Sequence, residues 1–188
     1  MTGPVIPIRA AGGPDRGWLG AEDWARGSTF LEFVDAASTQ RAVIEAAFRR
    51  TAPAPEDVVA AEGVRRTLRI VAFVAAGDLE AATNIAHAER FFATGSNLWL
   101  RVFDPVSAAD LVERFLPEVS SASSHLAFFA EDGRACARWG PRPARLQAKY
   151  DAEPAAKHAA LRETFYAVSD GREQAREWGA ILRTCGGS

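Results

Sequence analysis

Three apolar runs in the middle of the chain dominate the hydrophobic pattern of the sequence. They cover residues 68–75, 98–103 and 125–130, and the first contains one charged side chain, Arg69. A short apolar run without polar alternation is typical of a strand that is covered on both faces of a sheet. The first run therefore predicts a central strand, and the other two predict further strands.

A fourth strand is predicted at residues 134–139, where apolar and polar residues alternate. Alternation indicates an outer strand with one face toward solvent. Glu131-Asp132-Gly133, directly before it, is a strong hairpin signal, so we expect antiparallel pairing with the run before the turn. One face of this strand would carry Ala135, Ala137 and Trp139, and the other would carry Arg134, Cys136 and Arg138.

Helical spacing of apolar residues connects these strands. Residues 78–92 predict a helix with Asp78 as its N-cap, and residues 107–116 predict a second helix capped by Ser107. A helical crossover makes the first two strands parallel. The resulting order of elements is that of the thioredoxin fold, an α/β fold with a mixed central sheet flanked by helices. The inward face of the first helix is predicted to hold Leu79, Ala82, Ile85, Ala86 and Phe92.

The length of 188 residues suits one domain. The first 26 residues are rich in glycine and proline, which predicts a loose N-terminal arm. The predicted domain covers residues 27–184, with a helical lead-in at 28–64, a core at 67–150, further helices at 154–184 and a tail at 185–188.

Composition and charge narrow the function classes. Hydrophobic residues make up 48% of the chain and charged residues 24%, which is typical of a soluble globular protein. The net charge of −2 gives no electrostatic reason to expect nucleic acid or an anionic membrane as partner. No apolar segment approaches the ~20 residues of a membrane span, and the N-terminus lacks the regions of a signal peptide. We therefore expect a cytoplasmic protein.

The two cysteines, Cys136 and Cys185, are too few for a disulfide framework. In a cytoplasmic protein we expect both thiols to be reduced and Cys136 to be a small strand residue. Cys185 could still meet Cys136 or another chain, and the sequence does not decide between these pairings.

Two segments resemble a family of bacterial thioredoxin-like proteins. Residues 128–133 read Phe-Phe-Ala-Glu-Asp-Gly, and the next strand ends in Trp139, Gly140, Pro141 and Arg142. In that family an apolar strand runs into Asp-Glu-Asp-Gly, and the following strand ends in Trp-Gly-Pro-Arg. The likeness extends to segments 28–34 and 111–116 and covers roughly residues 27–150. It implies a thioredoxin-like fold.

The chain departs from this family at the residues that carry its chemistry. The family usually has Trp-Cys-Gly-Asp after its first strand, and the matching residues here are Ala75, Ala76, Gly77 and Asp78. The position of a second cysteine falls on Leu79. Thiol exchange requires a thiolate, so the resemblance predicts a degenerate active site with no catalytic residue and no cofactor.

The loop that faces this site would contain Ser123, Ser124 and His125. The cis-proline of thioredoxins falls on Ser124 or His125. A cis bond before a residue other than proline costs about 3 kcal/mol, so we expect a trans, rearranged loop. The serines and the histidine lack the Gly-x-Ser-x-Gly context of a hydrolase nucleophile.

Other candidate groups have simpler interpretations. His87, His125 and His158 show no metal-ligand spacing, so no metal site is predicted. Asp78 is more simply a helix cap than a functional acid. The basic cluster of Arg138, Arg142 and Arg145 is expected to be a solvated face.

These observations predict a redox-inactive thioredoxin-like protein, which we do not expect to be an enzyme. It would bind a protein or peptide in an apolar groove between the loop at Ala76 and the loop at Ser124. The alternative is a thiol-disulfide oxidoreductase or redox sensor that uses a relocated cysteine, Cys136 or Cys185. A third hypothesis is self-association, for example as a homodimer, through exposed tryptophans such as Trp139.

Overall fold

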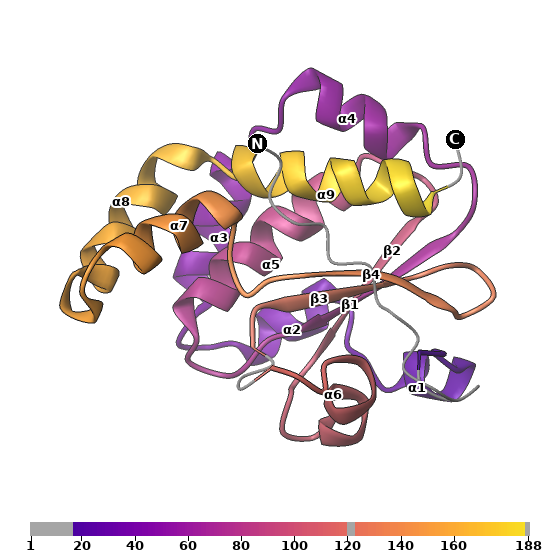
Figure 1. Cartoon of the computed structure of the whole chain (residues 1–188). Helices are drawn as coiled ribbons and strands as arrows, with labels where there is room; N and C mark the ends of the chain where they lie inside the picture. The colour runs from indigo at the N-terminus through magenta and orange to yellow at the C-terminus, as the bar shows by residue number, and fades with distance from the viewer. Residues whose placement is uncertain (1–16, 120–122, 187–188) are drawn as a thin grey trace.

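A computed structural model describes residues 17–119 and 123–186 (Figure 1). Its centre is a four-stranded sheet in the order β2-β1-β3-β4. The strands are β1 (Leu68–Phe73), β2 (Leu98–Phe103), β3 (His125–Phe129) and β4 (Ala135–Trp139). β1 and β2 are parallel, whereas β3 is antiparallel to both β1 and β4. The predicted strands and the mixed α/β class are confirmed.

Helices cover both faces of the sheet (Figure 1). One face packs against α3, α4, α5 and α9, and the other faces α1 and α6. The helices are α1 (Ala21–Ala25), α2 (Phe30–Ala36), α3 (Arg41–Arg50), α4 (Pro55–Glu62), α5 (Leu79–Phe92), α6 (Ala109–Phe115), α7 (Ala144–Ala152), η1 (Ala155–Lys157), α8 (His158–Ser169) and α9 (Arg172–Cys185). None of these described helices is both long and apolar enough to cross a bilayer.

β1 separates two hydrophobic cores. Ile70 and Ala72 point into the core under α5 and α9, whereas Val71 and Phe73 point into the core under α6. All four side chains are buried, which explains why the run lacks polar alternation.

The predicted N-terminal arm differs from the structure over residues 17–26. Leu19 is buried in the core under α6, and α1 follows it directly. The Trp18 indole donates to the carbonyl of Asp132 at 2.7 Å, and Leu19 N–H donates to Gly133 at 2.8 Å. This segment is therefore attached to the β3–β4 turn. Residues 1–16 of the predicted arm and residues 187–188 of the tail lie outside the described residues.

The cap predictions give mixed results. Thr29 forms a capping box with Glu32 at the start of α2, and Asp78 caps α5. Ser107 does not cap α6, which begins after Ala108 without a side-chain cap. Ser107 instead donates its N–H to Asp104 at 2.9 Å, within the turn that follows β2.

The inward face predicted for α5 is wrong at Leu79, which is 45% exposed. α5 lies between the sheet on one side and α3, α8 and α9 on the others, so most of its surface is buried (Figure 1). Polar residues Glu80, Asn84 and His87 are therefore buried together with the apolar ones. They recur at the spacing of one helix face.

A bulge in the β3–β4 pairing changes the faces predicted for β4. Phe128 pairs with Ala137 and Phe129 with Ala135, so Cys136 is an extra residue between two pairs. Ala135 therefore packs in the core under α6, whereas Ala137 belongs to the core under α9. Cys136 packs against this second core and not on an outer face with the arginines.

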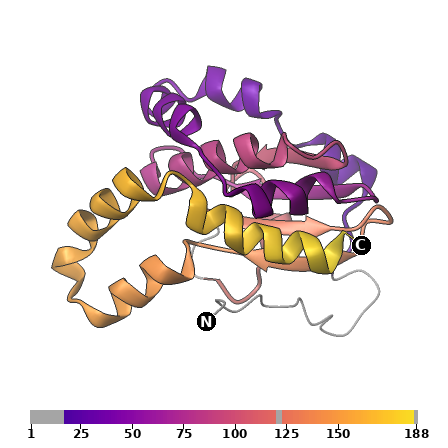
Figure 2. The same cartoon turned by 90° about the horizontal axis from the view of Figure 1, so that it is seen from above.

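α7 and α8 form a hairpin that extends away from the sheet in both views (Figures 1 and 2). Leu146, Phe165 and Tyr166 form its own small hydrophobic cluster. The chain enters this hairpin from β4 and leaves it into α9, which lies along the sheet. The hairpin thus joins the two elements that the cysteines connect.

Candidate functional site

The turn from β1 to α5 lies where the sequence places the degenerate active site. Ala76 and Gly77 are exposed, and Gly77 has a φ of +83° that favours glycine. Asp78 follows as N-cap, and its Oδ1 accepts the N–H groups of Glu80 and Ala81, each at 3.0 Å. The predicted capping role of Asp78 is confirmed.

The loop before β3 faces this turn, as predicted. The Ser123 hydroxyl donates to Asp78 Oδ2 at 2.6 Å, and Ala75 N–H donates to Ser123 Oγ at 3.2 Å. Ser124 N–H donates to the carbonyl of Phe73 at 2.8 Å, with Ser124 at a φ of +67°. Neither Ser124 nor His125 follows a cis peptide bond, which agrees with the predicted trans loop.

A hollow of about 410 Å³ opens between the two loops, and we call it the groove. Its composition differs from the predicted apolar groove, because acidic, basic and hydroxyl side chains dominate the walls. Of the predicted residues from the β1–α5 turn, only Asp78 lines it. The full lining is Asp78, Glu80, Glu118, Val119, Ser123, Ser124, His125, Pro141 and Arg142.

An ion pair crosses one wall of the groove. Arg142 donates to both carboxylate oxygens of Glu80, at 2.9 and 3.1 Å, and to Gln147 at 2.8 Å. Burial by itself lowers the pKa of the Arg142 guanidinium. The hydrogen bonds and the charge of Glu80 outweigh burial, so the pKa of Arg142 is raised. The prediction of a solvated basic face is therefore wrong for Arg142. Arg138 and Arg145 pair with Glu118 and Glu173.

Asn84 holds the floor of the groove through a hydrogen-bond network. Its amide nitrogen donates to Ser124 Oγ at 2.7 Å and to the carbonyl of Pro141 at 3.3 Å. Its amide oxygen accepts from Tyr166 at 3.0 Å and from Gln174 at 3.1 Å. Asn84 is 1% exposed and thus connects α5 to the loop before β3, to α8 and to α9.

This hydrogen-bond network is not predicted by the sequence. Burial, followed by the charge of Glu80, raises the pKa of Tyr166 well above its usual value, so its hydroxyl remains a donor. The available signal was the spacing of Glu80, Asn84 and His87 along one face of a helix. The partners from α8 and α9 have no such local signal.

The Trp-Gly-Pro-Arg segment begins at the last residue of β4 and contacts α9 through Trp139. Trp139 is 7% exposed, and its indole N–H donates to a carboxylate oxygen of Glu177 at 2.5 Å. Its ring packs edge-on against Trp178, with 5.1 Å between the ring centroids. The other carboxylate oxygen of Glu177 accepts Ala144 N–H at 2.8 Å. Trp139 is therefore not an exposed contact for self-association. Trp18 and Trp99 are exposed.

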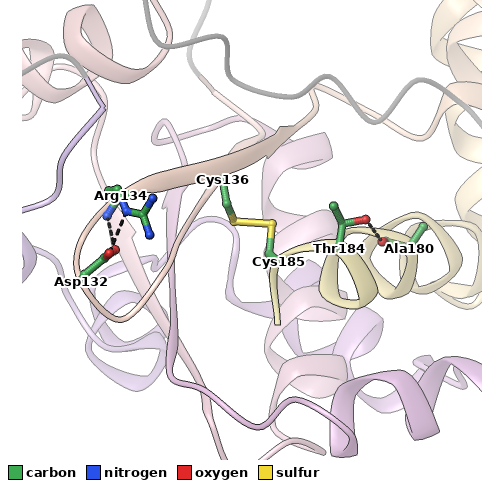
Figure 3. Close-up of a disulfide and its surroundings, with 6 residues drawn as sticks. All are labelled: Asp132, Arg134, Cys136, Ala180, Thr184 and Cys185. Atoms are coloured by element: carbon green, nitrogen blue, oxygen red, sulfur yellow. Dashed lines mark hydrogen bonds and ion pairs between the residues drawn. A yellow bond between two sulfur atoms is a disulfide. The ribbon is translucent and has the colours of Figure 1, made fainter. Parts of the chain in front are cut away.

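The two cysteines form a disulfide, which corrects the prediction of reduced thiols (Figure 3). It joins Cys136 in β4 to Cys185 at the end of α9, with the Cα atoms 6.0 Å apart. A second hollow of about 500 Å³ adjoins it and is lined partly by Leu68, the first residue of β1, and by Arg66 just before it. The disulfide and the groove therefore lie toward opposite ends of the sheet.

The three histidines have separate surroundings. His87 is buried, with Nδ1 2.8 Å from Thr51 Oγ1. The ring of His158 stacks on that of Tyr150, with 4.0 Å between the ring centroids. His125 is buried at the groove, with Nδ1 3.2 Å from the carbonyl of Ser123. Within residues 17–119 and 123–186, no group of three or more histidine, cysteine or acidic side chains could hold a metal ion.

Comparisons with known proteins address the fold alone. The sequence matches no protein-family model and none of the curated proteins. The structure is similar to an HIV epitope-scaffold, with a TM-score of 0.69 and 16% identity, over 89% of this chain and 98% of the scaffold. It is also similar to PA1234, a Pseudomonas aeruginosa protein of unknown function, with a TM-score of 0.65 and 17% identity, over 88% of this chain and 96% of that one.

Proposed function

We propose that the chain is a redox-inactive thioredoxin-like protein that binds a protein or peptide in the groove. The observation that carries this proposal is the hollow of about 410 Å³ at the β1–α5 turn, in which none of the described lining residues contains sulfur. A concave site with a few converging polar groups is the usual form of a binding site.

Several features support the thioredoxin-like assignment. A helix connects the parallel strands β1 and β2, and an antiparallel hairpin, β3–β4, follows in the order β2-β1-β3-β4. Trp139, Gly140, Pro141 and Arg142 then lead from this hairpin into the wall of the groove. The family resemblance in the sequence places its former cysteine at Ala76, beside the same groove.

Hydrogen bonds among the described residues hold the walls of the groove in place. Ser123 and Asp78 connect the two loops, and Asn84 fixes Ser124 and Pro141 from below. A pre-organised site loses little conformational entropy when it binds. Because Asp78, Glu118 and Arg142 line the walls, we expect the bound segment to contribute polar or charged groups.

A second candidate function is thiol-disulfide exchange by Cys136 and Cys185. The observation in its favour is that both cysteines are half-buried beside the second hollow. Against it, Cys185 is the last residue of α9, and the negative end of a helix dipole disfavours a thiolate. Turnover in a disulfide-reductase assay that Cys136→Ser abolishes would favour this candidate over the first.

Selection from a displayed peptide library tests groove binding. We expect Glu118→Arg to weaken the selected peptides roughly tenfold, because it reverses a charge on the rim of the groove. Glu62→Arg, the same substitution at an exposed residue at the end of α4, should leave their affinity unchanged. Equal affinity for the wild type and Glu118→Arg would contradict the proposal.

A further inference from the structure

Two arginines and two tryptophans gather on the sheet face that α1 partly covers. The register places Arg69 of β1 beside Trp99 of β2, with Arg101 two residues further along β2. All three side chains share one face because side chains alternate along a strand. Trp24 of α1 lies over them, 5.9 Å from the Arg69 guanidinium and 5.5 Å from that of Arg101. We call these four residues the Arg–Trp surface.

One carboxylate, that of Glu32, lies near the positive charge of this surface but forms no direct ion pair with it. Among the described residues, no acidic side chain forms an ion pair with Arg69 or Arg101. Arg101 donates to the carbonyl of Gly27 at 2.5 Å, and the nearby Glu32 carboxylate is bonded to Thr29. Asp23, next to Trp24, is paired with Arg114 and Arg26.

The edge of the sheet next to the Arg–Trp surface has outward backbone groups. Leu68 N–H donates to Asn97 and Val74 N–H to Phe103, so the odd-numbered residues of β2 bond with β1. Val102 bonds outward instead, exchanging two hydrogen bonds with Ser28. The same alternation directs the backbone of Leu98 and Leu100 outward. No described strand pairs with that edge.

Trp99 stands between these two features. Its side chain is 58% exposed, although tryptophan is highly buried on average in folded proteins. Trp99 is thus an exposed aromatic side chain beside two arginines without ion pairs and beside a strand edge. Three modes of recognition are combined in one place. They are apolar contact, charge-assisted hydrogen bonding and β-augmentation.

We propose that the Arg–Trp surface and the adjoining edge of β2 bind a short, extended, acidic peptide segment of a partner protein. Its backbone pairs with Leu98 and Leu100, its carboxylates bond to Arg69 and Arg101, and an apolar side chain covers Trp99. None of these residues lines the groove, so the proposal does not depend on the function proposed there.

Two observations favour a peptide over nucleic acid, the other anionic class that aromatic and basic side chains attract. The outward N–H and C=O groups of Leu98 and Leu100 can extend a hydrogen-bond ladder only with another peptide backbone. The net charge of −2 also gives a long polyanion no overall attraction to the chain. The bridge at Ser28 ends the open edge, so the bound segment must be short.

The test titrates the full chain with a short peptide of alternating glutamate and valine. Amide shifts are followed by NMR, and tryptophan fluorescence gives the affinity. We expect shifts at Leu98 and Leu100, and affinity that falls with added salt. Arg69→Gln and Trp99→Ala should each weaken binding roughly tenfold. Arg66→Gln removes an equal charge from an exposed arginine outside this surface and should change little.

Four results would overturn the proposal. The first is that a lysine–valine peptide binds as well as the acidic one. The second is that Arg66→Gln weakens binding as much as Arg69→Gln does. The third is that oligothymidylate binds more tightly than the peptide, which would assign the surface to nucleic acid. Unperturbed amides of Leu98 and Leu100 in the wild type at millimolar peptide would also exclude it, whatever the variants do.

Discussion

Different chemistry holds the two ends of the sheet. At the carboxyl end of β1, the groove is held by a hydrogen bond from Asn84 to Ser124, by one from Ser123 to Asp78, and by the Arg142–Glu80 ion pair. Toward the other end, the Cys136–Cys185 disulfide fastens β4 to α9. The chain therefore has no sulfur where the resembling family has its reactive cysteine, and uses both its cysteines as a covalent link elsewhere.

This difference separates two tasks that sulfur can perform. A reactive thiol needs access and a helix start, whereas a structural disulfide needs two segments close together. Cys185 lies at the end of α9 and Cys136 in a bulge, which meets the second requirement and not the first. Substitutions at each end can test how independent the two ends of the sheet are.

The largest effect should come from the disulfide. It closes a loop with a sequence separation of 49 residues, and in the chain-entropy account a loop of that length contributes about 4 kcal/mol. We expect Cys136→Ala with Cys185→Ala to lower the free energy of unfolding by about that amount in urea, with the amide shifts around Asn84 unchanged. Reduced wild-type protein should match the double variant. If a reductant leaves the unfolding midpoint unchanged, the link is not formed in solution.

Asn84→Ala should weaken the other end by about 3 kcal/mol. It removes the common partner of Ser124, Tyr166 and Gln174, and each buried group left without a bond costs about 1–3 kcal/mol, partly relieved by relaxation. Asn97→Ala is the matched control, because that side chain makes one hydrogen bond, to the carbonyl of Val64. Equal losses of unfolding free energy in the two variants would contradict the network described here.

The sequence predicted the strands far better than it predicted these interactions. Apolar runs and the Glu131-Asp132-Gly133 turn are local signals, and the structure has strands and a hairpin at those places. Asn84 and Gln174 lie 90 residues apart, and although Glu80, Asn84 and His87 share one helix face, no local signal pairs Asn84 with Gln174. The sequence therefore predicted that the two loops face each other, but it did not predict the polar lining of the hollow between them.

The prediction of two reduced cysteines is wrong for a related reason. Strict alternation along β4 placed Cys136 with Arg134 and Arg138 on an outer face. The bulge opposite Phe128 and Phe129 shifts the pairing by one residue and turns Cys136 toward α9. No residue type marks this bulge, so the sequence could not exclude the reduced form.

The free energy that stabilises α5 in the fold should also depend on pH, whereas that of the disulfide should not. Burial, followed by the charge of Arg50, lowers the pKa of His87 from 6.5 to about 4. The unfolded chain then binds more protons than the folded one between these values, so stability falls as the pH drops from about 6.5 toward 4. The loss at pH 5 relative to pH 7 should be about 2 kcal/mol.

Urea unfolding at several pH values measures this dependence on His87. His87→Gln should flatten the slope of unfolding free energy against pH in that window, even if it lowers stability at pH 7. His158→Gln is the control, because His158 is only half-buried and stacks on Tyr150 at the surface hairpin. A slope that survives in His87→Gln would assign the effect to another group.

The smallest effect on stability should accompany the largest effect on the groove. Asp78→Ala removes the cap of α5 and the acceptor of the Ser123 hydroxyl, and losing a cap costs about 1 kcal/mol. Thr29→Ala removes the cap of α2, which lies outside the groove lining, at a similar cost. If the groove is the binding site, peptides selected on the wild type should lose affinity for Asp78→Ala and bind Thr29→Ala normally. Equal binding to both variants would mean that the turn at Asp78 serves only the fold.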